Sequence, residues 1–371
     1  MTDLSSQYLR LKGEIDAAMQ EVMLNADFIN GGAVKTFCSR LSEYLDIPYV
    51  ISCGNATDGL RISLQALGVG QDDDVIVPAF TYIAPVEAIA AVGASPILVD
   101  VEADTFNINP ELIEKAITNR TKAIVVVHLF GQSSNFEMIR KIAGKYNLAV
   151  IEDCAQSFGS SYTFSDGKTQ KLGTLGTVGV TSFFPTKPLA CSGDGGAVFT
   201  ADAALAEKIR LLANHGQSEK YRHKMIGFNS RLDTLQAAIL NVKLSYFEEF
   251  TKRRIELAEQ YDKTLKSCPD LILPAKPLFT SHVYHQYTVQ VKDGKRDDLK
   301  RFLAEKGIAS MVYYPLPVHE QEGYKWVARI AGNLTESVRL CNEVLSLPIH
   351  SEMSDETQNR IIEAVGEFFF R

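Results

Sequence analysis

A lysine close to two prolines is the most chemically suggestive feature of the sequence. Lys187 lies between Pro185 and Pro188, at the end of an apolar run and ahead of a glycine-rich stretch. Prolines restrict the backbone on either side and would hold the amine in place. Burial lowers the pKa of a lysine, and the neutral amine is a nucleophile toward carbonyl carbons. Lys187 is therefore a candidate for covalent catalysis, with a solvated loop lysine as the alternative.

Two further segments could bind the parts of a phosphorylated ligand. Glu152 and Asp153 follow an apolar strand pattern, and ligands of parallel sheets bind at the carboxyl ends of the strands. The segment 52–58 leads from a strand into a helix, whose first N–H groups suit a phosphate, with the Thr57 hydroxyl as a further donor. A solvated turn and an ordinary N-cap are the respective alternatives.

The order of these three segments is more informative than any one of them. A phosphate-binding helix start, an aspartate at a strand end and a constrained lysine are the parts that a pyridoxal-phosphate site needs. The aspartate would keep the pyridine nitrogen protonated, and the lysine would form a Schiff base. We therefore expect pyridoxal 5'-phosphate as the cofactor, with Lys187 and Asp153 as catalytic residues.

The composition argues against several other classes of protein. The 371 residues are 46% hydrophobic and 22% charged, which is typical of a globular chain. A net charge of −7 argues against nucleic-acid binding, which normally needs a basic surface. The six cysteines are irregularly spaced, without a Cys-x-x-Cys pair, so we expect neither a metal site nor disulfides. No signal-peptide pattern or membrane-length apolar run is present, and we expect a cytoplasmic protein.

Short apolar runs alternate with helical patterns through the first two-thirds of the chain. Strands are expected at 49–52, 75–77, 97–99, 123–127, 148–151, 178–183 and 196–200. Helices are expected between them at 55–67, 85–92, 110–117 and 136–146, and after them at 203–213. This alternation predicts an α/β domain whose mostly parallel sheet is covered on both faces.

The pattern changes toward the C-terminus. One long helix is expected at 233–254, and it could bridge two domains. A smaller α+β region follows, with strands expected at 283–291 and 309–314 and helices at 296–306 and 335–345. We expect a large domain over 1–248 and a small C-terminal domain over 249–371.

The chain resembles the sugar aminotransferases of the DegT family over nearly its whole length. The most specific stretches are Gly54–Asp58, Pro78–Ala84, Ile151–Ser157, Ser182–Lys187, Gly193–Gly196 and Gly227–Asp233. The resemblance implies the type I aminotransferase fold, with a mostly parallel seven-stranded sheet in the large domain. It also implies a homodimer with shared active sites.

The resemblance further implies a role for individual residues. Lys187 would form the Schiff base and move protons, and Asp153 would pair with the pyridine nitrogen. Gln156 would lie near the phenolic oxygen of the cofactor, and Tyr82 would stack on its ring. The phosphate would be held by Ala56, Thr57, Ser182 and, from the neighbouring subunit, Asn229. The sugar nucleotide would meet Arg231, Tyr313 and Tyr314; for Arg231 a structural ion pair with Asp233 is the alternative.

Within the family, the chain is most similar to enzymes that move an amino group from L-glutamate to a UDP-linked 3-keto, 2-acetamido uronic acid for surface polysaccharides such as O-antigen. It departs from their usual motifs at Ala190–Ser192, Tyr313 and Gly31–Gly32. A dTDP- or GDP-linked 3- or 4-keto-6-deoxyhexose is therefore an alternative acceptor. A sugar dehydratase and a non-catalytic cofactor-binding regulator are further alternatives, although dehydratase relatives carry histidine in place of Lys187.

Overall fold

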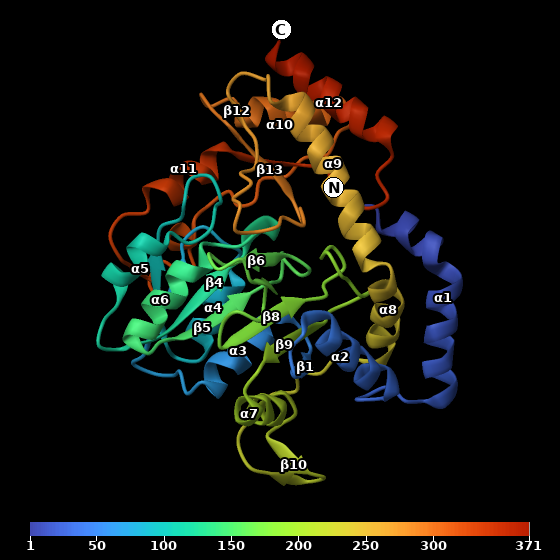
Figure 1. Cartoon of the computed structure of the whole chain (residues 1–371), viewed down its shortest axis with the longest axis vertical. Coiled ribbons are helices and arrows are strands. Elements are labelled where there is room, and N and C mark those ends of the chain that lie inside the picture. The colour runs from blue at the N-terminus through green and yellow to red at the C-terminus, as the bar shows by residue number, and fades with distance from the viewer. Residues whose placement is uncertain (371) are drawn as a thin grey trace.

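The computed structural model describes residues 1–370, and an eight-stranded sheet lies at its centre (Figure 1). In sheet order the strands are β1 (Tyr49–Cys53), β9 (Gly196–Thr200), β8 (Val178–Ser182), β5 (Ala149–Asp153), β4 (Thr121–Val127), β2 (Asp74–Pro78), β3 (Ser95–Val99) and β14 (Arg329–Ile330). Neighbours from β8 to β14 are parallel, whereas β9 is antiparallel to β8 and β1. The mostly parallel sheet is confirmed, and the short β14 adds an eighth strand to the seven expected.

Helices cover both faces of this sheet, as the alternation of elements predicts. One face is covered by α3 (Ala56–Ala66), α4 (Ala84–Ala91) and α7 (Ala203–Ala213), and the other by α5 (Pro110–Ala116) and α6 (Phe136–Tyr146). Two N-terminal helices that we did not expect, α1 (Leu4–Asn25) and α2 (Gly32–Leu45), pack on α8 (Thr234–Ser245). Figure 1 shows α1 along the outer edge of the molecule beside α8.

The C-terminal part has its own small antiparallel sheet and its own core. The sheet contains β12 (Leu271–Ile272), β13 (Tyr287–Val291) and β15 (Val344–Leu347). Around it lie α9 (Phe247–Leu265), α10 (Arg296–Glu305), α11 (Thr335–Glu343) and α12 (Asp355–Phe369). The α+β character of this region agrees with the expectation, and the domain boundary at 248/249 stays a prediction.

The remaining elements are short. Two hairpins are formed by β6 (Ser161–Thr163) with β7 (Thr169–Lys171) and by β10 (Gln217–Glu219) with β11 (Arg222–His223), and single 3₁₀ turns are η1 (Leu129–Gly131) and η2 (Val318–Glu320). Across residues 1–370, no helix is both long enough and apolar enough to cross a membrane.

The expectation of a single helix over 233–254 is wrong, because the chain forms two helices, α8 and α9, with a break at Tyr246. The backbone of Tyr246 leaves the helical region, with φ −106° and ψ 0°. The two helices have different partners, since α8 packs on α1 and α2 whereas α9 packs on α12. The break therefore coincides with the change of packing partner, and no proline or glycine in the sequence 233–254 marks the point.

Two expected strands also differ from the structure, and both differences involve the cavity described below. The strand expected at 283–291 begins only at Tyr287, where pairing with β15 starts. The segment 309–314 forms no strand, because only Met311 makes a bridge, to Ser346. The helix expected at 335–345 ends at Glu343, and the following apolar residues form β15.

Candidate active site

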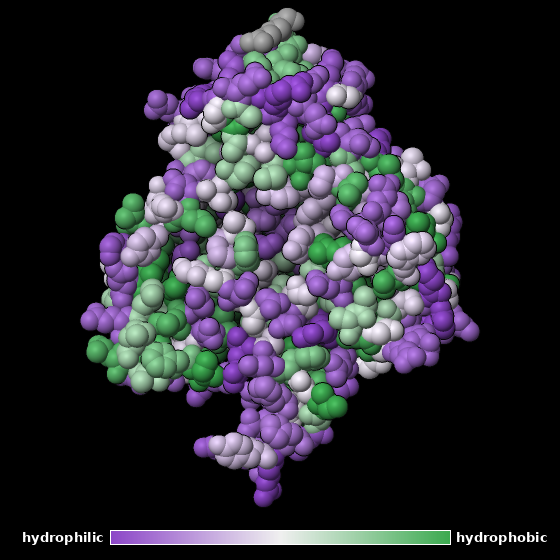
Figure 2. Space-filling view, turned by 180° about the vertical axis from the view of Figure 1, so that it is seen from behind, coloured by the Kyte–Doolittle hydropathy of each residue, from purple (hydrophilic) through white to green (hydrophobic). Residues whose placement is uncertain are grey.

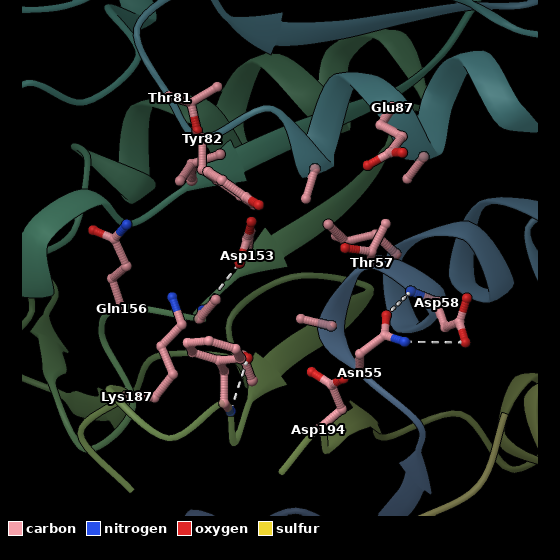
Figure 3. A pocket seen from close by; sticks show the side chains of 18 of the residues that line it. Asn55, Thr57, Asp58, Thr81, Tyr82, Glu87, Asp153, Gln156, Lys187 and Asp194 are labelled. Atoms are coloured by element: carbon pink, nitrogen blue, oxygen red, sulfur yellow. Dashed lines mark hydrogen bonds between the residues drawn. The ribbon is translucent and has the colours of Figure 1, made fainter. Parts of the chain in front are cut away.

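A cavity of about 810 Å³ lies at the carboxyl ends of β2, β4, β5 and β8, where the parallel topology predicts a ligand site (Figure 3). All of the residues that we expected at the site line this cavity, except Asn229 and Arg231. The expected residues that line it are Ala56, Thr57, Tyr82, Asp153, Gln156, Ser182, Lys187, Tyr313 and Tyr314.

One end of the cavity is formed by the first turn of α3. The Asn55 side chain caps the helix by accepting a hydrogen bond from the Asp58 N–H at 2.8 Å. The N–H groups of Ala56 and Thr57 have no partner within the helix and lie beside the cavity. A Cβ atom on Gly196 would be 2.7 Å from the carbonyl carbon of Asn55, so glycine is needed for β9 to approach this turn.

Neighbouring carboxylates at the end of β5 face opposite sides of the sheet, because side chains alternate along a strand. Asp153 lines the cavity. Glu152 is fully buried away from it, 3.0 Å from His128 Nε2, and accepts hydrogen bonds from the backbone N–H groups of Gly173, Leu175 and Gly176. Asp153 is therefore the carboxylate of the pair that faces the cavity, and Glu152 holds the loop 173–176 by hydrogen bonds.

The Asp153 carboxylate is buried without an ion-pair partner among residues 1–370. Its Oδ1 atom accepts a hydrogen bond from the Ala155 N–H at 3.0 Å. Burial raises the pKa of Asp153, and the Ala155 hydrogen bond and the charges of Lys187 and His128 oppose this rise. A cationic N–H group in the cavity would keep the carboxylate ionised.

The Lys187 amine points into the cavity on the same side as Asp153 and Gln156 (Figure 3). The Lys187 N–H closes a turn by donating to the Phe184 carbonyl at 2.8 Å, which fixes the start of the side chain. Burial lowers the pKa of Lys187, and the Asp153 charge partly opposes this change. A lowered pKa increases the fraction of neutral, nucleophilic amine.

The Gln156 amide is held from both ends. Its Oε1 atom accepts from the Phe130 N–H at 2.7 Å, and its Nε2 atom donates to the Tyr314 hydroxyl at 3.0 Å. The Tyr82 ring lies 6.1 Å from that of Tyr314 and is 56% exposed, which leaves its face free for a planar ligand. The ring of Tyr82 projects over the cavity in Figure 3.

Two expected site residues lie outside the lining of this cavity. Asn229 is exposed and bridges to Asn214, and Arg231 is partly buried without an ion pair to Asp233 in the described chain. Their roles stay predictions, and the one proposed for Asn229 involves a partner subunit.

The cavity is also lined by residues that were not expected at the site. They are Asn55, Asp58, Arg61, Thr81, Glu87, Phe184, Thr186, Asp194, His285 and Gln286, together with the apolar residues Leu60, Ala84, Ala88, Ala91, Val127 and Ala155. Asp194 lies in the glycine-rich run that follows Lys187, whereas His285 and Gln286 were hidden inside an expected strand.

The arrangement fits pyridoxal phosphate. The first turn of α3 offers N–H groups to a phosphate, and Asp153 offers a buried carboxylate to a ring N–H. Tyr82 offers an exposed aromatic face, and the Lys187 amine has no hydrogen-bond partner among the described residues.

Comparison with known proteins agrees with this assignment. The chain is 44% identical over 371 residues (all of this chain and 98% of the other) to a "pleiotropic regulatory protein" of Geobacillus stearothermophilus. It is 45% identical over 348 residues (94% of each chain) to a UDP-2-acetamido-2-deoxy-3-oxo-D-glucuronate aminotransferase of Pseudomonas aeruginosa. It is 43% identical over 366 residues (99% and 98%) to a dTDP-3-amino-3,6-dideoxy-α-D-galactopyranose transaminase of Aneurinibacillus thermoaerophilus.

Solved structures have the same fold. The structure of DesV from S. venezuelae in complex with a ketimine intermediate is 37% identical, with a TM-score of 0.95 over all of this chain and 98% of that one. A Bacillus subtilis relative with bound cofactor PMP is 32% identical, with a TM-score of 0.89 over 97% and 82%. The model of the DegT/DnrJ/EryC1/StrS aminotransferase family matches residues 10–366. The chain therefore belongs to this family of nucleotide-sugar aminotransferases and is a pyridoxal-phosphate-dependent transaminase.

Proposed function

We propose that the enzyme moves the amino group of L-glutamate onto the keto carbon of a UDP-linked 3-keto, 2-acetamido sugar, most simply the uronic acid. The observation that carries the chemistry is the meeting of Lys187, Asp153 and the α3 start in one cavity. The 45% identity to the Pseudomonas aeruginosa enzyme supports the UDP-linked acceptor.

When bound, pyridoxal phosphate supplies an aldehyde carbon that accepts amino groups and a ring that stores the electron pair of a broken C–H bond. The residues of the chain do the rest. The α3 N–H groups with Thr57 and Ser182 would bind the phosphate, and Tyr82 would orient the ring. Asp153 would hold a proton on the ring nitrogen, because an ionised carboxylate stabilises a neighbouring cation.

Lys187 would move the proton in each half of the reaction. Its Nζ atom would take a proton from the α-carbon of glutamate and give it to the former aldehyde carbon of the cofactor. The keto-sugar would then pass through the same steps in reverse, which predicts ping-pong kinetics. The turn at Phe184 fixes the base of the side chain and so limits the volume in which Nζ can move.

A dTDP-linked keto-sugar is the second candidate acceptor, supported by the 43% identity to the Aneurinibacillus enzyme. The test is a direct competition with glutamate as donor. UDP-linked 2-acetamido-3-oxo-glucuronate and a dTDP-linked 3-keto-6-deoxyhexose are supplied together, and each amino-sugar is quantified by mass spectrometry. We expect kcat/KM to favour the UDP substrate by about tenfold or more, the discrimination that a few lost contacts produce. A preference for the dTDP sugar would contradict the proposal.

We also propose that the enzyme works as a homodimer. The hairpin β10–β11 projects from the body in Figures 1 and 2, and Tyr221 between its strands and Ile226 just after it are 83% and 88% exposed. Such apolar exposure on a projecting segment suits burial against a second copy. Asn229 follows this segment and would then reach the neighbouring cavity. Light scattering should give twice the 41.0 kDa mass of one chain, and a monomer would contradict the proposal.

A further inference from the structure

One wall of the cavity contains side chains with polar atoms that have no hydrogen-bond partner among residues 1–370. His285 and Gln286 line the cavity and are only 8% and 7% exposed. Within the described chain, His285 Nδ1 and Gln286 Oε1 are buried without hydrogen-bond partners. Buried polar atoms in folded proteins are nearly always paired, so the two unpaired atoms single out His285 and Gln286 as cavity-lining side chains whose hydrogen bonding the fold alone does not complete.

The atoms of His285 and Gln286 that are left to face the cavity are both hydrogen-bond donors. A buried N–H without an acceptor is rarer than a buried acceptor without a donor, so we assign the lone pair of His285 to Nδ1. The ring N–H is then at Nε2, the nitrogen left to face the cavity. In the same way Gln286 buries its oxygen and leaves its Nε2 amide group for the cavity. Burial, assisted by the charges of Lys187 and Arg254, lowers the pKa of His285 well below its usual value, so the ring is neutral.

A buried cation lies behind this wall. Arg254 on α9 is 6% exposed, and its Nη1 atom donates only to the carbonyl groups of Tyr284 and Ile349, at 3.4 and 3.1 Å. It makes no ion pair in residues 1–370, and its burial lowers its pKa to about 10, so it is charged at neutral pH. A buried charge without a partner is costly, and an anion bound at the wall would compensate the charge of Arg254.

The charges of the cavity itself restrict where an anion can bind. Figure 3 shows Asp58, Glu87 and Asp194 on the side away from Gln156 and Lys187. Arg61, the other lining cation, is paired with Asp58 at 3.0 Å. The backbone N–H of Gln286 donates to the Phe130 carbonyl at 3.4 Å, and the backbone N–H of Phe130 donates to the Gln156 side chain. Gln286 therefore lies on the same side of the cavity as Gln156. Asp153 also lies on this side, but it would pair with the cationic ring N–H of the cofactor, so this side is still the more favourable one for the carboxylate of a donor.

We propose that His285 and Gln286, backed by Arg254, form the carboxylate subsite that receives the amino donor. The proposal rests on the transaminase function and adds how a donor with two carboxylates binds. Among the described residues, Lys187 is the only lining cation of the cavity without an ion-pair partner. A uronic acid carries the same carboxylate chemistry, so the sugar is the competing occupant. The two neutral donors would bind the oxygens, and Arg254 would supply the positive potential without entering the cavity.

The test measures binding without turnover. Glutarate, a five-carbon dicarboxylate without an amino group, is titrated calorimetrically into the enzyme loaded with pyridoxal phosphate. His285→Phe removes one donor, and Gln286→Glu places a like charge at the other. Each is expected to weaken glutarate binding about tenfold or more, which corresponds to about 1.4 kcal/mol. His285→Gln, which keeps an N–H donor, should restore part of the affinity. Gln260→Glu on the exposed face of α9 is the matched charge control and should bind glutarate like the wild type.

A second arm separates the two sources of the carboxylate. UDP-glucuronate and UDP-glucose are titrated into the same variants, and the ratio of their affinities should not change. Unaltered glutarate binding in both variants, or no glutarate binding by the wild type, would overturn the subsite. A loss confined to UDP-glucuronate would overturn its assignment to the amino donor. Because glutarate contains neither an amino group nor a sugar, a wrong acceptor sugar would leave the glutarate result unaffected, which separates failure of the subsite from failure of the proposed acceptor.

Discussion

Replacing Lys187 with alanine is expected to lower kcat for amino transfer by about 10⁴-fold, the upper end of what a positioned proton-transfer group contributes. The variant loses the only cavity-lining lysine of the described chain, and with it both the nucleophile and the base. Release of 2-oxoglutarate from glutamate in a single turnover measures the loss before any sugar is involved.

The matched control for Lys187 is Lys243 on α8. Lys243 is 7% exposed, and burial lowers its pKa as it does for Lys187, but it does not line the cavity. Lys243→Met should therefore retain kcat within a small factor. Comparable losses in both variants would indicate a general effect of buried lysines on the fold and would contradict the assignment of Lys187.

Asp153→Asn is expected to lower kcat by about 10³-fold, because it replaces the charge that holds the ring proton by a neutral amide of the same shape. The volume at the end of β5 is unchanged, so cofactor binding should weaken much less than the rate falls. Stopped-flow absorbance after mixing with glutamate measures the rate, and equilibrium dialysis measures bound cofactor.

Glu152→Gln is the control for Asp153, since both residues are buried carboxylates at the end of one strand. In the wild type, backbone N–H groups donate to both oxygens of the Glu152 carboxylate. In the variant the amide NH₂ group would replace one oxygen and would face an N–H group that it cannot accept from. We expect a loss of about 1–3 kcal/mol in the free energy of unfolding, measured with urea, and near-normal kcat. If Glu152→Gln lost activity as far as Asp153→Asn without unfolding, the division of roles between these two carboxylates would be wrong.

The parts of the site that local sequence encodes were predictable. The start of α3, the end of β5 and the turn that holds Lys187 each depend on a few consecutive residues, and each lies at the cavity. The sequence analysis named Asp153 rather than Glu152, and the register of β5 against β4 and β8 is what places Asp153 at the cavity.

The parts that depend on distant segments were not predictable. His285 and Gln286 lie inside the stretch 283–291 that was expected to form one strand. Pairing with β15 begins only at Tyr287, so the two residues are left at the cavity. The aromatic run at Tyr313–Tyr314 has strand propensity, but it lines the cavity instead of joining a sheet. The break at Tyr246 and the eighth strand, β14, likewise arise from tertiary packing.

The most direct test of the account is to locate the bond between the cofactor and the protein. The purified enzyme is loaded with pyridoxal phosphate, reduced with borohydride, digested and mapped by mass spectrometry. We predict that the added mass lies on Lys187 and on no other lysine, and that glutamate added before reduction prevents the labelling. Labelling at another lysine, or labelling that glutamate does not prevent, would contradict the claim that Lys187 carries the amino transfer.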